Sequence, residues 1–138
     1  RAIKLANKKI FIKDYIDKLK LLPKNDYLII EGAGGLYSPI STDGYNIDLV
    51  KKMKIPTVLV AKDEIGVINN ILLSLNLLQK HKIPVLAIVL NKINNIQPDG
   101  MDNYKDIKSL TKIPLIKIHN TKTKNRKEFL KLLKIIST

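Results

Sequence analysis

Three short stretches of the sequence combine residue types that could bind a metal ion, a nucleotide or an anion. In the first, Glu31 is followed by the small residues Gly-Ala-Gly-Gly at 32–35. Mg²⁺ takes one or two carboxylates together with phosphate oxygens, so a single Glu could ligate a nucleotide-bound metal, and glycines let a ligand approach the backbone. The alternative is a glycine-rich turn with an incidental Glu. The spacing fits neither the dinucleotide-binding fingerprint nor a P-loop.

The second and third stretches offer an anion site and a base-reading amide. The sequence Gly-Val-Ile-Asn-Asn at 66–70 begins the longest expected helix, and the N–H groups and dipole of a helix start attract carboxylates or phosphates. Asn91 ends an expected strand, and its amide carries the donor and the acceptor that the edge of a purine ring requires. An ordinary helix cap and a strand-ending Asn that caps its own turn are the alternatives.

Other polar residues give weaker signals. Asp63 and Glu64 are adjacent in a loop, where neighbouring side chains usually point apart, so we expect surface charges rather than a paired-carboxylate site. His81 and His119 have no acidic partner at metal-ligand spacing, and we expect solvated or capping histidines.

The elements that must position these residues alternate along the chain. Helical spacing of apolar residues predicts helices at residues 10–20, 46–54, after Gly66, at 104–110 and at 125–136, and short apolar runs predict strands at 27–30, 57–61, 85–90 and 114–118. This alternation indicates a single α/β domain over residues 1–138, a three-layer fold in which helices flank a parallel sheet. Ligands bind such sheets at the carboxyl ends of the strands, so loops 31–35, 62–70, 91–100 and 119–123 should form one rim.

Composition excludes several classes of protein. The 25 basic and 12 acidic residues give a net charge of +13, but only two of the basic residues are arginine and the lysines are dispersed, which argues against a nucleic-acid partner. With no cysteine, thiolate sites and disulfides are excluded. No apolar run is long enough to span a membrane, so we expect a soluble protein, and without disulfides its expected location is the cytoplasm. The chain opens on Arg1 rather than methionine, which suggests a piece of a longer protein.

Several of these motifs, taken in order, resemble the dethiobiotin synthetase family. The likeness rests on the segment Tyr-Leu-Ile-Ile-Glu-Gly-Ala-Gly-Gly-Leu-Tyr-Ser-Pro-Ile at 27–40, followed by Asp-Leu at 48–49, Ile-Pro-Thr-Val-Leu-Val at 55–60, Ile-Gly-Val-Ile-Asn-Asn at 65–70 and Val-Leu-Asn at 89–91. It extends over nearly the whole chain to about Ile118. The resemblance implies a partial P-loop NTPase-like fold.

The resemblance also implies an activity and a set of site residues. Family members convert 7,8-diaminopelargonate, CO₂ and MgATP to dethiobiotin, ADP and phosphate, and act as homodimers. On this basis Glu31 would ligate Mg²⁺, and Asn91, Ile118 and His119 would lie beside the adenine of ATP. The substrate would contact the backbone of Gly34 and Gly35, and its carboxylate would be held across the dimer interface by Val67, Ile68, Asn69 and Tyr104.

Two departures separate this chain from the family pattern. The P-loop, with its phosphate-binding Lys, is not in the sequence, so we expect no catalytic residue in this portion and no activity from the 138 residues alone. Residues 113–119 lack the Gly-x-Ile-Pro of the family, and His119 stands where Pro is usual. The alternatives are a non-catalytic remnant or nucleotide-binding module without the P-loop, and a cobalamin-pathway or partition-type P-loop relative.

Overall fold

The computed structural model describes residues 8–23, 27–93, 98–119 and 125–137. The chain divides into two compact units, residues 1–55 and 56–138, and each is described by itself. The expectation of a single domain over residues 1–138 stays a prediction.

The second unit is built on a three-stranded parallel sheet. Its strands are β1 (Thr57–Lys62), β2 (Val85–Lys92) and β3 (Leu115–His119), and they lie side by side in that order. Lys62 is the register partner of Asn91, and His119 is the partner of Lys92, so the three strands end at the same edge of the sheet. Any ligand that binds at the carboxyl ends of the strands would meet this edge.

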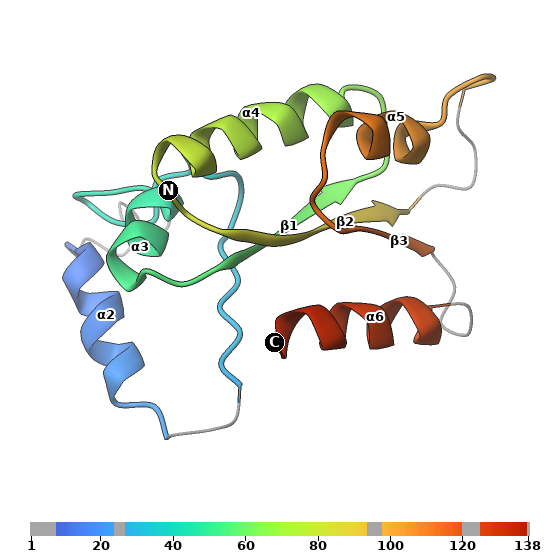
Figure 1. Ribbon diagram of the computed structural model, residues 1–138. Helices are drawn as coiled ribbons and strands as arrows, with labels where there is room; N and C mark the ends of the chain where they lie inside the picture. The colour runs from blue at the N-terminus through green and yellow to red at the C-terminus, as the bar shows by residue number, and fades with distance from the viewer. Residues whose placement is uncertain (1–7, 24–26, 94–97, 120–124, 138) are drawn as a thin grey trace. The chain divides into compact units, whose positions relative to one another are not determined.

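Helices cover both faces of this sheet, as Figure 1 shows. On one face lie α4 (Val67–Lys80) and α5 (Asn103–Leu110), and on the other lies α6 (Arg126–Ile136). The predicted α/β class with helices flanking a parallel sheet is therefore confirmed. None of the helices in the described part of the chain has the length and apolar character needed to span a bilayer.

The alternation of side chains along β2 creates a separate core on each face of the sheet. Ile88 and Leu90 pack with Ile71 of α4 and Ile107 of α5. Ala87 and Val89, which point the opposite way, pack with Ile116 and with side chains of α6. Because both faces of β2 are buried, its sequence is a continuous apolar run, and this run predicted the strand.

The first unit contains α2 (Ile12–Lys20), α3 (Asn46–Met53) and, shortly before α3, a turn at residues 40–44. The carboxylate of Asp43 accepts hydrogen bonds from the backbone N–H of Ile12 at 2.9 Å and from the hydroxyl of Ser41 at 2.8 Å. The hydroxyl of Tyr15 donates to the carbonyl oxygen of Ile40 at 2.8 Å. These bonds attach the start of α2 to the turn at residues 40–44.

The strand predicted at residues 27–30 is wrong. The structure describes no strand there, and Ile29 is 82% exposed. A continuous apolar run indicates a strand that neighbouring strands and helices cover on both faces. No such neighbours are described in the first unit. Its described β pairing is an isolated bridge between Pro39 and Tyr45. The sheet therefore has three strands in the described residues instead of the four expected.

Candidate functional site

The glycine-rich turn of the first unit requires glycine at one of its positions. Gly34 has a φ of +78°, and a Cβ at that position would collide with the hydroxyl of Ser38, so the turn itself requires this glycine. At Gly35 a Cβ would meet no atom within 4 Å. Open space beside a backbone without a side chain fits the predicted close approach of a ligand at Gly35.

Asn46 holds the glycine-rich turn, a role that the sequence did not reveal. It is the first residue of α3, and the cap of this helix is Tyr45, whose backbone N–H donates to Asp48 at 3.0 Å. The buried amide of Asn46 instead donates to the carbonyl oxygens of Ala33 and Gly35, both at 2.9 Å. No spacing rule signals such a contact, because it joins a side chain to backbone groups more than ten residues away.

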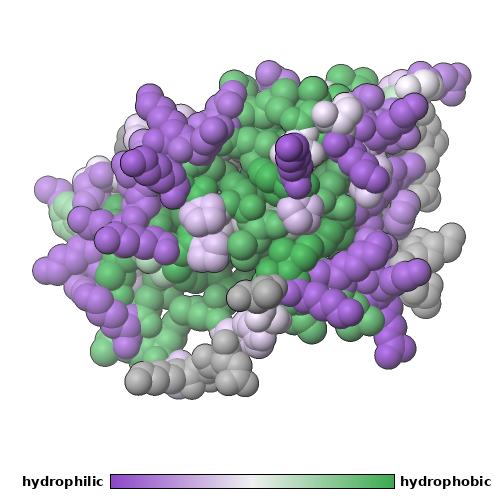
Figure 2. All heavy atoms as spheres, in the orientation of Figure 1, coloured by the Kyte–Doolittle hydropathy of each residue, from purple (hydrophilic) through white to green (hydrophobic). Residues whose placement is uncertain are grey.

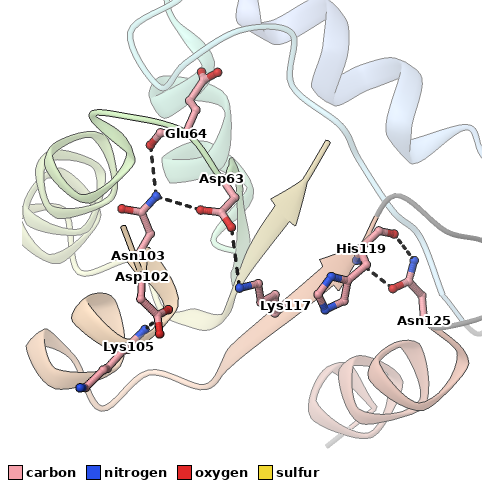
Figure 3. Close-up of polar contacts among 8 residues, drawn as sticks. All are labelled: Asp63, Glu64, Asp102, Asn103, Lys105, Lys117, His119 and Asn125. Atoms are coloured by element: carbon pink, nitrogen blue, oxygen red, sulfur yellow. Dashed lines mark hydrogen bonds and ion pairs between the residues drawn. The ribbon is translucent and has the colours of Figure 1, made fainter. Parts of the chain in front are cut away.

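The predicted nucleotide residues of the second unit come together at the edge of the sheet. Asn91 in β2 is the register partner of Ile118 in β3, so their side chains share the face that α6 covers. His119 follows directly and is exposed, as expected. Its backbone N–H donates to Oδ1 of Asn125 at 2.8 Å, and its carbonyl accepts from the same amide, as Figure 3 shows. The side chain of His119 is thus its remaining group for a ligand.

The predicted anion site lies at the start of α4, on the opposite face of the sheet. Gly66, with a φ of +87°, turns the chain into the helix. The backbone N–H of Val67 already donates to the carbonyl oxygen of Glu64 at 3.1 Å, whereas those of Ile68 and Asn69 have no backbone partner among the described residues. Two of the three expected donors are therefore available to an anion.

Tyr104 lies near this helix start. It is the second residue of α5, and it packs against the same apolar core as Val67 and Ile68. The structure therefore places Tyr104 on the same core as Val67 and Ile68, for which the family resemblance implies contact with the same substrate carboxylate. The loop at 31–35 belongs to the first unit, so its place on a common rim with these residues stays a prediction.

The expectation that Asp63 is a surface charge is wrong. Its side chain is 1% exposed, while the neighbouring Glu64 is exposed and forms an ion pair with Lys62 at 2.6 Å. Asp63 accepts a hydrogen bond from the amide of Asn103 at 2.8 Å, and Nζ of Lys117 lies 4.0 Å from its second oxygen. The adjacent pair does point apart, but one member points inward, because α5 and β3 supply polar partners that are distant in sequence.

The acidic residues bear on the predicted metal site. The described residues contain no group of three or more His, Asp or Glu side chains that could hold a metal by themselves. Glu31 is exposed at the entrance to the glycine-rich turn. A lone exposed carboxylate fits a Mg²⁺ ion whose other ligands are phosphate oxygens and water, and it does not fit a closed structural metal site.

Comparison with known protein families gives one broad match. A family model with the description AAA domain matches residues 1–119 of the chain. This domain is P-loop NTPase-like, which agrees with the predicted fold.

Individual relatives share a narrower description. The chain is 41% identical over 92 residues to a protein of Vesicomyosocius okutanii named ATP-dependent dethiobiotin synthetase BioD, a match that covers 67% of this chain and 41% of the relative. Proteins of the same name from Nitrosopumilus maritimus and Campylobacter jejuni are 33% identical over 114 residues and 42% identical over 111 residues. Each of these two matches covers 78% of this chain, and 50% and 52% of the respective relative.

The chain spans about half the length of the curated relatives it matches. The motifs that suggested the family lie within residues 1–119, which the family model matches. The chain therefore belongs to the AAA-domain family that this model describes and, within it, to the dethiobiotin synthetase family that its sequence resembled.

Proposed function

We propose that this chain is part of an ATP-dependent dethiobiotin synthetase. In the proposed reaction one amine of 7,8-diaminopelargonate takes up CO₂ to form a carbamate, ATP phosphorylates the carbamate, and the second amine closes the ureido ring with release of phosphate. ADP and phosphate are the other products. The observation that carries the proposal is the similarity to relatives with this name over 67% to 78% of the chain.

The nucleotide would lie at the carboxyl edge of the sheet, on the face that α6 covers. Asn91 would pair with the edge of adenine through its amide, and Ile118, beside it in the register, would contact the ring. His119 would contribute its side chain only, because Asn125 engages its backbone groups. This support is geometric: the residues assigned to one ligand are neighbours in the sheet.

The metal and the diamine would use the remaining residues. Glu31 would supply a carboxylate to Mg²⁺, which would neutralise charge on the transferred phosphoryl group when bound. The substrate would lie against the backbone of Gly34 and Gly35, where the space beside Gly35 is open. Its carboxylate would be held at the start of α4 in a homodimer, chiefly by the N–H groups of Ile68 and Asn69 with Tyr104.

Phosphoryl transfer would depend on residues outside this sequence. The sequence contains no Gly-Lys-Ser/Thr of a P-loop, whose Lys contacts the β- and γ-phosphates. We therefore expect residues 1–138 alone to be inactive and the intact gene product to carry the activity in the cytoplasm. The alternatives are a non-catalytic nucleotide-binding remnant and a P-loop relative from cobalamin synthesis or partition systems. Neither would hydrolyse ATP in a way that depends on 7,8-diaminopelargonate.

The experiment is an assay of the intact gene product, with an intact-mass measurement on the same sample. Release of phosphate from MgATP should require both 7,8-diaminopelargonate and bicarbonate, and dethiobiotin should appear in equal amount. The variant E31Q should lower kcat by at least about 100-fold if Glu31 ligates the metal. The matched control E128Q alters an ion pair with Lys131 on α6 and should leave activity unchanged. ATP hydrolysis that ignores the diamine would overturn the proposal.

A further inference from the structure

Asp63 is a buried carboxylate at the point where β1 passes into the turn before α4. Its side chain is 1% exposed, and burial of a charge is costly unless hydrogen bonds and an opposite charge compensate it. Here Asn103 of α5 donates to it at 2.8 Å, and Lys117 of β3 lies 4.0 Å away. Three elements that are separate in sequence therefore meet at one carboxylate, as Figure 3 shows.

The first branch of this cluster reaches the start of α4. The amide nitrogen of Asn103 that donates to Asp63 also lies 3.3 Å from the carbonyl oxygen of Glu64. That carbonyl in turn accepts the backbone N–H of Val67 at 3.1 Å. The turn from which the N–H groups of Ile68 and Asn69 project is thus connected to the first residue of α5 through a buried amide.

The second branch reaches Tyr104. Lys117 extends from β3 on the face that α4 and α5 cover, and its ammonium group lies 5.8 Å from the centre of the Tyr104 ring. At this distance a cation is attracted to an aromatic face. The charge of Asp63 also attracts this ammonium group. The position of the Tyr104 ring therefore depends on Asp63, and so does the turn at the start of α4.

We propose that Asp63 is a positioning residue for the subsite of the substrate carboxylate. Through Asn103 it fixes the turn that presents the N–H groups of α4, and through Lys117 it fixes the ring of Tyr104. The N–H groups of α4 and the ring of Tyr104 must keep a fixed distance from each other to bind one carboxylate. They belong to α4 and α5, which β2 separates in the sequence. This inference rests on the proposed function, and it assigns to Asp63 a role that acts through other residues.

The test compares three variants of the intact gene product in steady-state kinetics and in titrations with 7,8-diaminopelargonate. D63L removes the acceptor for Asn103 and the charge for Lys117, whose side chain is 27% exposed and can turn to water. We expect KM for the diamine to rise about 10-fold or more, with kcat within about twofold, because the interaction serves binding in the ground state and transition state alike. D63N keeps an acceptor of the same shape and should recover part of this loss.

D102A is the matched control for a structural effect. Asp102 caps α5 by accepting from the backbone N–H of Lys105 at 3.2 Å, one residue from Asn103, and it does not touch Asp63. Its removal should lower the melting temperature and leave KM unchanged. Backbone N–H cross-peaks of Ile68 and Asn69 in NMR spectra without ligand should move in D63L and stay in place in D102A.

Each result decides the proposal. An unchanged KM in folded D63L would overturn the role of Asp63 while leaving the proposed function intact. A wild-type protein that does not bind the diamine would remove the proposed function and this inference with it. If D63L does not fold, the variant K117M decides, because it releases Tyr104 and leaves Asp63 bonded to Asn103. A KM for the diamine raised about threefold or more in K117M supports the proposal, and an unchanged KM overturns it.

Discussion

The side-chain amide of Asn46 donates a hydrogen bond to the carbonyl oxygen of Gly35 at 2.9 Å, and so joins the first turn of α3 to the glycine-rich turn. A second bond from the same nitrogen reaches Ala33. The oxygen of the amide faces Gly32, where a Cβ would lie 3.0 Å from it. The turn that would carry the metal carboxylate and receive the substrate thus owes its shape to one polar side chain from the following helix.

Substitution of Asn46 should therefore destabilise the first unit. N46A leaves two carbonyl oxygens without their donor, and we expect the free energy of unfolding to fall by about 1–2 kcal/mol. N46D has the same shape but presents only oxygens to these carbonyls, so it should be less stable than N46A. Urea denaturation measures both. N76A, an exposed Asn on α4, is the control and should change stability by less than about 0.5 kcal/mol. An N46D protein as stable as the wild type would contradict the assignment.

Lys82 is strained at the carboxyl end of α4, and glycine should relieve the strain. It has a φ of +56°, its N–H donates to Gln79, and the next residue, Ile83, donates to Leu78, both at 2.9 Å. This Schellman arrangement favours glycine, because the left-handed conformation costs an L-residue about 1–2 kcal/mol. We expect K82G to raise the free energy of unfolding by about 1 kcal/mol. K80G, at the last residue of α4, should lower it, and a destabilised K82G would contradict the explanation.

The pH dependence of the first unit should report Asp43. The backbone N–H of Ile12 and then the hydroxyl of Ser41 hold the pKa of this carboxyl below its ordinary value of 3.8. A carboxyl whose pKa is lower in the folded state stabilises the fold above the unfolded pKa, and this contribution is lost as the pH falls through the folded pKa. The difference in unfolding free energy between wild type and D43N should be constant above about pH 5 and shrink below about pH 4. A difference that grows toward low pH would contradict the lowered pKa of Asp43.

The elements of the second unit could be predicted because each of them carries its own pattern. The stripe of apolar residues on α4 and the continuous apolar run of β2 are local signals. The structure confirms both: α4 begins at Val67, directly after Gly66, and β2 begins at Val85 as predicted and ends two residues beyond the predicted end. The strand at residues 27–30 failed because a run of the same kind requires partners that its own sequence does not encode.

The site residues also divide into those with a local sequence signal and those that depend on a distant partner. The places of Asn91 at the end of β2 and of Val67 at the start of α4 could be predicted because strand ends and helix starts are local features. The burial of Asp63 and the clamp of Asn46 were missed, since each depends on a contact between residues far apart in the sequence, up to 40 positions for Asp63 and Asn103. Polar residues in loops carry no periodic signal that tells which of them will meet a distant partner.

The outer edge of β1 should make residues 1–138 poorly soluble when they are expressed alone. β1 is an edge strand of the described sheet, and Val60 in the middle of it is 63% exposed. Figure 2 likewise shows hydrophobic residues exposed among hydrophilic ones on the face in view. An exposed apolar edge strand pairs readily with other chains, and a lysine in the strand opposes such pairing.

V60K should accordingly increase the monomeric fraction of this polypeptide in light scattering and size-exclusion chromatography. V58K places the same charge on the same face of β1, but Val58 packs against the core formed by Ala87, Val89 and Ile116, so that variant should unfold the second unit instead. The two variants have equal net charge, so a difference between them cannot come from charge repulsion alone and must come from the position of the residue in the strand. A wild-type polypeptide that is monomeric and melts cooperatively would contradict the prediction that this edge drives association.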